Sequence, residues 1–194
     1  LDIKSKPSRT ISGVAPVAIM TMPMKCPHGT CIFCPGGPGS YFGDVPQSYT
    51  GNEPASMRAI RNKFDPYLQV FNRLEQYALL NHNFEKCEVI IMGATFNAFP
   101  ASYQNEFVKR AFDGFNESNS LDLATSQEKN ETAKHRVIGL TLETRPDYCT
   151  QTHIQQMLSF GCTRVELGVQ SLDDDVLKKV KRGHTVQATI DATQ

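Results

Sequence analysis

The sequence has no long apolar segment, no internal repeat and no Gly/Ser-rich or Pro-rich linker. No hydrophobic run approaches the ~20 residues that a helix needs to cross a bilayer, and no secretory signal is visible. Six cysteines in 194 residues do not make a disulfide scaffold. With 40% hydrophobic residues, we expect one globular domain in a reducing compartment, the cytoplasm. Because residue 1 is leucine, we also expect the chain to be part of a longer protein.

The sequence has no net charge, but its charges are unevenly distributed. Residues 1–63 carry seven basic and three acidic side chains, whereas residues 64–194 carry thirteen and seventeen. Two interpretations are open. The imbalance is a matter of chance, or it gives the N-terminal part a positive rim that attracts a polyanion such as RNA.

Short apolar runs alternate with amphipathic stretches along the chain. The runs predict strands at residues 14–20, 89–92, 137–142 and 164–170. Pro16 suggests that the first strand lies at an edge of the sheet. Helices are expected from Pro54 and Pro66, over 107–115, from Thr150 to Gly161 and from Asp173 to Gly183. The second of these helices should have an apolar face, formed by Tyr67, Val70, Phe71, Leu74, Tyr77 and Ala78. Residues 116–134 are polar and are expected to form a surface insertion.

This alternation predicts an α/β fold with a parallel sheet of about four βα units. Four units cannot close an eight-stranded barrel, so the sheet is expected to be open or to be part of a larger barrel. Polar residues follow every predicted strand, and in a parallel sheet these positions share one rim. They are the cysteine loop, Gly93 to Phe96, Glu143 to Arg145, and Gln170 with Ser171.

Cys26, Cys31 and Cys34 lie within nine residues, directly after the first predicted strand. Three thiolates can hold three irons of a cubane iron–sulfur cluster and leave the fourth iron open to a substrate. Two alternatives stay open: a zinc site completed by His28, or redox-active or buried thiols. The scattered Cys87, Cys149 and Cys162 are interpreted as small buried hydrophobes. Pro35-Gly36-Gly37 would let the backbone approach a cluster or ligand closely.

Three further charged residues each have two interpretations. Glu143 either forms an ion pair with Arg145 or accepts hydrogen bonds from ribose hydroxyls. Arg182 either complements the dipole of a helix end or pairs with a ligand carboxylate. Lys86, just before the second strand, is at its simplest a solvated lysine.

The order of these motifs resembles the radical S-adenosylmethionine (SAM) enzymes, although their usual spacing is Cys-x3-Cys-x2-Cys and here it is Cys-x4-Cys-x2-Cys. Within them, the chain resembles the catalytic subunit of Elongator, a tRNA wobble-uridine modifying enzyme, and its archaeal members in particular. The resemblance runs from about residue 4 to the end. Its motifs are residues 6–15, 26–28, 34–38, 47–51, 53–61, 143–149, 168–171 and 182–185.

The resemblance implies a partial radical SAM (β/α) barrel that binds a [4Fe-4S] cluster on Cys26, Cys31 and Cys34. SAM would bind the open iron, and its cleavage would start a radical transfer from acetyl-CoA to the uridine, giving 5-carboxymethyluridine. The residues implied for SAM are Gly93, Ala94, Thr95, Glu143, Gln170 and Arg182. Ala94 departs from the glycine that most relatives have there. Lys86 would contact acetyl-CoA. The candidate tRNA contacts are Lys4, Lys6, Arg9, Arg58, Arg61 and Lys63.

By the same resemblance, residues 1–194 form a single partial domain that lacks the rest of the barrel and an acetyltransferase domain. Activity of such a fragment would be incomplete. Other Elongator-type subunits are expected as partners of a eukaryotic member, and no membrane is expected. A hypothesis of another class is a non-catalytic tRNA-binding module whose metal site is structural. A radical SAM enzyme acting on another substrate is a third hypothesis, against which the motifs at 47–51 and 53–61 argue.

Overall fold

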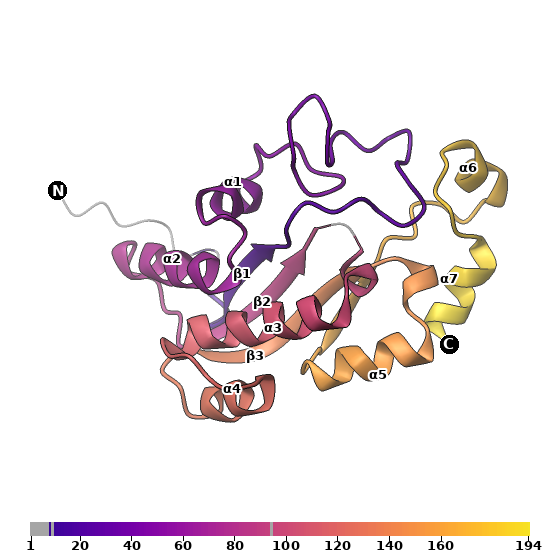
Figure 1. Cartoon of the computed structure of the whole chain (residues 1–194). Helices are drawn as coiled ribbons and strands as arrows, with labels where there is room; N and C mark the ends of the chain where they lie inside the picture. Colours follow the sequence, from indigo (N-terminus) through magenta and orange to yellow (C-terminus); the bar gives the residue numbers. More distant parts are fainter. Residues whose placement is uncertain (1–7, 9, 94) are drawn as a thin grey trace.

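A single parallel sheet forms the centre of the computed structural model, which describes residues 8, 10–93 and 95–194. Its strands are β1 (Ala15–Met20), β2 (Lys86–Met92), β3 (Arg136–Thr144) and β4 (Arg164–Leu167). They lie side by side in chain order, and every neighbouring pair is parallel (Figure 1). The prediction of an open α/β sheet built from four βα units is therefore confirmed.

Helices connect the strands and cover the sheet (Figure 1). They are α1 (Pro54–Arg61), α2 (Pro66–Leu79), α3 (Ala101–Asn116), α4 (Leu123–Asn130), α5 (Gln151–Ser159), α6 (Asp174–Lys179) and α7 (Val186–Thr193). Short 3-10 turns follow β2 at Phe96–Ala98 and β3 at Pro146–Tyr148. None of the helices in the described part of the chain is long and apolar enough to cross a membrane.

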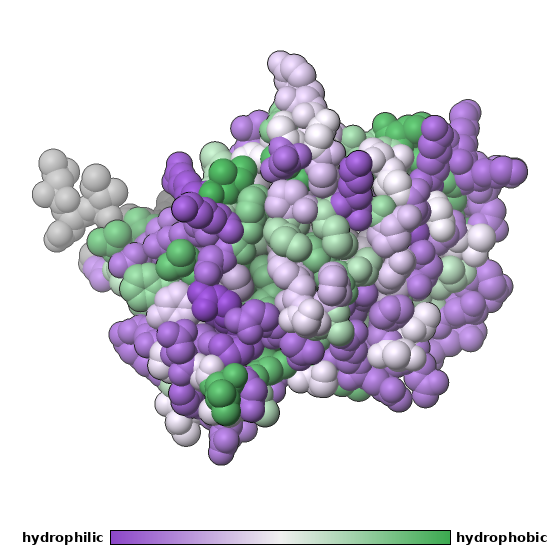
Figure 2. Space-filling model, in the orientation of Figure 1, coloured by the Kyte–Doolittle hydropathy of each residue, from purple (hydrophilic) through white to green (hydrophobic). Residues whose placement is uncertain are grey.

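The core lies between the sheet and the helices α2, α3 and α5. Alternate residues of the strands point into it, as expected for period-two side chains, and aromatic residues of the helices complete it. From α2 the predicted Val70, Leu74 and Tyr77 are buried, whereas Ala78 is exposed, contrary to the prediction. Figure 2 shows moderately apolar side chains over the centre of this face and strongly apolar side chains in separate patches towards its edges.

β1 is an edge strand, as Pro16 suggested, and the helices satisfy its outer backbone groups. The Tyr77 hydroxyl donates to the Pro16 carbonyl (2.6 Å), and Arg58 Nη2 donates to the Ala18 carbonyl (2.6 Å). Gln69 is fully buried and makes both bonds of Met20: its Oε1 accepts from the amide (2.8 Å) and its Nε2 donates to the carbonyl (3.0 Å). Side chains thus replace a missing neighbouring strand along this edge.

Three sequence expectations need correction. Residues 116–134 are not merely a surface insertion, because α4 packs on α3 with Ser126 and Asn130 buried. The fourth strand ends at Leu167, before the left-handed backbone at Gln170 (φ 71°). The helix expected from Thr150 to Gly161 ends at Ser159, and of its apolar residues only Met157 is buried, whereas Leu158 is 63% exposed.

Candidate functional site

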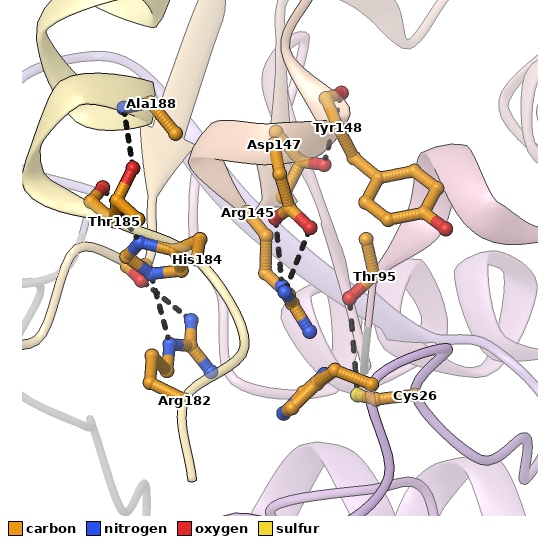
Figure 3. Close-up of polar contacts among 12 residues, drawn as sticks. Cys26, Thr95, Arg145, Asp147, Tyr148, Arg182, His184, Thr185 and Ala188 are labelled. Carbon is orange, nitrogen blue, oxygen red and sulfur yellow. Dashed lines mark hydrogen bonds and ion pairs between the residues drawn. The ribbon is translucent and has the colours of Figure 1, made fainter. Parts of the chain in front are cut away.

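The ends of β3 and β4, with the segments that follow β1 and β2, surround a cavity of about 460 Å³ at the carboxyl rim, where a parallel sheet binds its ligands. The cysteine loop after β1 covers one side, and the segments after β3, β4 and α6 form the others. The cavity is lined by Cys26, His28, Phe33, Cys34, Gln47, Ser48, Tyr49, Thr95, Glu143, Thr144, Arg145, Glu166, Leu167, Gly168, Gln170 and Arg182. Figure 3 shows how Cys26, Thr95, Arg145 and Arg182 are arranged in this region.

Each cysteine of the loop has a different partner. Cys26 Sγ lies 3.8 Å from Thr95 Oγ1, and Cys34 Sγ lies 3.6 Å from Ser48 Oγ. Cys31 is buried, with its Sγ 3.1 Å from His28 Nε2. Burial raises the pKa of the Cys26 and Cys31 thiols, so both are protonated at neutral pH until a metal displaces the protons.

The glycines after Cys34 allow the segment that contains Gln47 and Tyr49 to pack closely against them. A side-chain carbon at Gly36 would overlap the Tyr49 carbonyl, and one at Gly37 would lie 2.7 Å from the Gln47 amide. Buried Gln47 donates from Nε2 to the Gly36 carbonyl (3.1 Å). These contacts bring Tyr49 to the cavity, beneath the cysteine loop.

Glu143, at the end of β3, accepts a hydrogen bond from the Tyr49 hydroxyl (3.1 Å). Burial, reinforced by the neighbouring Glu166, raises the pKa of the Glu143 carboxyl. The alternative of an ion pair with Arg145 is wrong, because the Arg145 guanidinium binds Asp147 through two bonds of 2.9 and 2.7 Å. The Gly93 backbone also hydrogen-bonds to Glu143, and the lone pairs that remain on the carboxylate can accept from a ligand that donates hydroxyl groups.

Arg182 lies beyond the end of α6 and turns towards the cysteine loop. Its Nη2 donates to the Gly168 carbonyl and its Nε donates to His184 Nε2 (3.2 Å). Its Nη1 lies 3.7 Å from Cys31 Sγ. The guanidinium is thus fixed beside both the cavity and the cysteines, where it can meet an anionic group.

Several predicted site residues do not line this cavity. Lys86 begins β2, so it lies about 20 Å away along the strand at a rise of ~3.3 Å per residue. Arg58 and Arg61 line a second cavity of about 240 Å³, and Lys63 is exposed nearby. Burial lowers the pKa of Arg58 to about 10, with Arg73 adding repulsion. Lys4, Lys6, Arg9 and Ala94 lie outside the described residues.

Tyr49 and Glu166 line the cavity although the sequence did not predict them there, and Arg145 was predicted only to lie on the rim. Tyr49 and Arg145 belong to the motifs 47–51 and 143–149, but only the fold shows that their side chains reach the cavity. Glu166 lies within a strand, and no sequence signal marks its orientation. Gln170 and Thr95 line the cavity as expected, while Gly93 lies beside it with φ 108°.

The residues around the cavity fit a cluster with a bound nucleoside. Arg145 Nη1 and His28 Nδ1 are buried without a hydrogen-bond partner among the described residues, so both can serve a ligand. The cavity also offers a carboxylate for hydroxyl groups and a fixed guanidinium for an anion. No group of three His, Cys, Asp or Glu side chains in the described ranges is arranged to hold a metal ion. The thiolates of a cubane cluster each bind a different iron, so they lie farther apart than the ligands of a single metal ion.

The fold and the cysteine loop define a class of protein. Residues 20–194 match the Radical SAM superfamily, and the chain belongs to it. The particular relatives confirm the resemblance to the catalytic subunit of Elongator. The chain is 59% identical to a tRNA uridine(34) acetyltransferase of Methanocaldococcus infernus, over 99% of its own length and 36% of the relative. It is 46% identical to Elongator complex protein 3 of Homo sapiens, over 98% and 36%. The higher archaeal identity also agrees with the sequence analysis.

A solved structure gives the same result. The archaeal Methanocaldococcus infernus Elp3 with an N-terminal deletion superposes with a TM-score of 0.73 at 42% identity, over 93% of this chain and 34% of that one. The chain therefore spans about a third of the length of the relatives it matches.

Proposed function

We propose that this chain is the radical SAM core of a transferase that modifies the wobble uridine of tRNA. The proposed reaction uses a [4Fe-4S] cluster, SAM and acetyl-CoA and gives 5-carboxymethyluridine. One observation carries the proposal: the cysteine loop, Glu143 and Arg182 meet at one cavity on the carboxyl rim of the sheet. The name of the archaeal relatives, tRNA uridine(34) acetyltransferase, supports the tRNA substrate and the acetyl group.

In this proposal Cys26, Cys31 and Cys34 hold the cluster. The bound cluster supplies one-electron reduction of SAM. Gly93, Ala94 and Thr95 would receive the amino group of SAM. Glu143 and Gln170 would accept hydrogen bonds from its ribose, and Arg182 would pair with its carboxylate.

The chain's own residues set the geometry of this binding. Tyr49 holds the Glu143 carboxylate by its hydroxyl, and Gly168 and His184 hold the Arg182 guanidinium. Such prior fixation lowers the entropy lost when the substrate is oriented. The covering cysteine loop keeps water from one side of the cavity.

Contacts with the other substrates are proposed outside this cavity. Arg61 and Lys63 are exposed beside α1 and are suited to tRNA phosphates. Arg58 lines the same cavity as Arg61, and the proposal extends to Lys4, Lys6 and Arg9. Lys86 is proposed for acetyl-CoA, and Elongator-type subunits are proposed as partners in eukaryotic relatives.

The test is anaerobic iron–sulfur reconstitution, with spectra recorded before and after SAM and dithionite are added. The expected result is uptake of about four irons, as in a cubane site, and formation of 5′-deoxyadenosine. Cys31→Ala should lose both. Uptake of colourless zinc without deoxyadenosine would instead support a tRNA-binding module with a structural metal site, for which His28 next to Cys31 would supply the nitrogen ligand.

A further inference from the structure

The turn after α6 touches the cysteine loop at three points, although about 150 residues separate them in the sequence. The Ile32 amide, between two of the cysteines, donates to the Val180 carbonyl (3.1 Å). Arg182 Nη1 lies 3.7 Å from Cys31 Sγ. The third contact is between the His28 ring and Gly183. The loop is thus held by the turn as well as by its own ends.

The contact between His28 and Gly183 leaves no room for a side chain. A Cβ atom at Gly183 would lie 2.5 Å from His28 Cβ, 2.9 Å from Cγ and 3.1 Å from Cδ2. Carbon atoms pack at about 3.5–4.0 Å, so the ring or the turn would have to move. The same ring lies with Nε2 3.1 Å from Cys31 Sγ. Displacing it would therefore disturb the buried cysteine directly.

Ending α6 does not require this glycine. Lys181 already takes the left-handed conformation that stops a helix (φ 56°), and the Arg182 amide donates to the Leu177 carbonyl, as in a helix-terminating motif. Gly183, two residues further on, has φ 80° but makes no part of that motif. Its positive φ by itself favours glycine, and the packing of His28 on its Cα is a second, separate reason why this position carries no side chain.

We propose that Gly183 and His28 are positioning residues, through which the turn at residues 180–184 holds Cys31 in place for its ligand. The inference rests on the proposed function for the identity of that ligand, a cluster. The placement of the Cys31 thiol is a property of the chain alone. It can therefore be measured in protein that contains no iron.

The chain offers a matched control for Gly183→Ala. Gly161 follows α5 with φ 77°, close to the 80° of Gly183, but a Cβ there meets its nearest neighbour, Gln127 Nε2, at 3.5 Å. That distance is an ordinary contact. Gly161→Ala thus introduces the same backbone strain without the collision, and the difference between the two variants reports the collision alone.

The first measurement is the alkylation rate of each cysteine in the iron-free protein, followed by peptide mass spectrometry. Cys31 is only 1% exposed. We expect Cys31 to be alkylated about tenfold faster in Gly183→Ala than in Gly161→Ala. A tenfold change corresponds to a free energy towards the lower end of the cost of overpacking a core. The rate at Cys87, in the core, should be the same in both. Equal Cys31 rates in the two variants would overturn the proposal.

The second measurement uses reconstituted protein and follows iron release to a chelator. Gly183→Ala should release iron faster than Gly161→Ala. In a His28→Gly background, which lacks the Cβ as well as the ring, adding Gly183→Ala should cause no further increase, because no side chain remains to collide. The double variant also serves if Gly183→Ala alone fails to fold. Additive effects of the two changes would contradict the inference. If wild-type protein takes up no iron, the proposed function fails, while the alkylation rates still decide the positioning role.

Discussion

Replacing Gln69 by Leu should destabilise the strand from which the cysteine loop starts. Met20, the last residue of β1, is fully buried, and both of its outward backbone groups bond to the Gln69 amide, at 2.8 and 3.0 Å. Leucine has nearly the same size but leaves the amide and the carbonyl unpaired. Each orphaned group costs about 1–3 kcal/mol. The loss of unfolding free energy should therefore be about 2–4 kcal/mol, after some relaxation towards solvent.

Urea unfolding, followed by circular dichroism, measures this loss. Gln76→Leu is the matched control, because Gln76 lies on the same helix but is exposed. It should change the free energy of unfolding by no more than ~0.5 kcal/mol. A Gln69→Leu variant as stable as this control would show that the edge of β1 does not need the amide, and would refute the reasoning.

Two further predictions concern ligands, and a third concerns the edge of the sheet. Because burial raises the pKa of Glu143, its carboxylate is protonated at a higher pH than an ordinary carboxyl. SAM binding, measured by calorimetry, should therefore begin to weaken on acidification at a higher pH than an ordinary carboxyl would give. Glu143→Gln should weaken SAM binding about tenfold at neutral pH and abolish this pH dependence. A wild-type affinity independent of pH would contradict the ribose assignment. Arg61→Ala should lower tRNA affinity and reduce the salt slope by about one without changing stability. Arg58→Ala should mainly destabilise the fold, because it removes the bond to the Ala18 carbonyl; unchanged melting of that variant would contradict the edge role.

The parts of the fold that could be predicted are those with local causes. Pro54 and Pro66 begin helices because their fixed φ suits a first turn, and Pro16 marks an edge strand because it donates no bond. The α4 helix was missed because its amphipathic pattern is weak and its buried residues are Ser126 and Asn130. Their side chains bond to α3 and to the chain before β3, which no apolar period reveals.

The candidate site also has parts that the sequence predicts and parts that it does not. The spacing of Cys26, Cys31 and Cys34 indicates its chemistry, because three thiolates so close together suit a metal centre. The partners of Glu143 and Arg145 could not be read from the sequence. These two residues lie two positions apart, which in a regular strand would place both on one face and suggested an ion pair, but β3 ends at Thr144 and a 3-10 turn follows at Pro146–Tyr148, so Arg145 has already left the strand. Glu143 therefore meets Tyr49 and Arg145 meets Asp147.

The position of the cysteine loop depends on nearly the whole chain. Its start is fixed at Met20 by Gln69 from α2, and its middle is fixed at Ile32 by Val180 after α6. The first support lies beside β1, at one edge of the sheet, and the second comes after β4, which forms the other edge. A change in either one moves the thiols relative to Glu143, which stands on β3 between them. The nine-residue motif thus determines which group binds, and the sheet determines where that group meets its substrate.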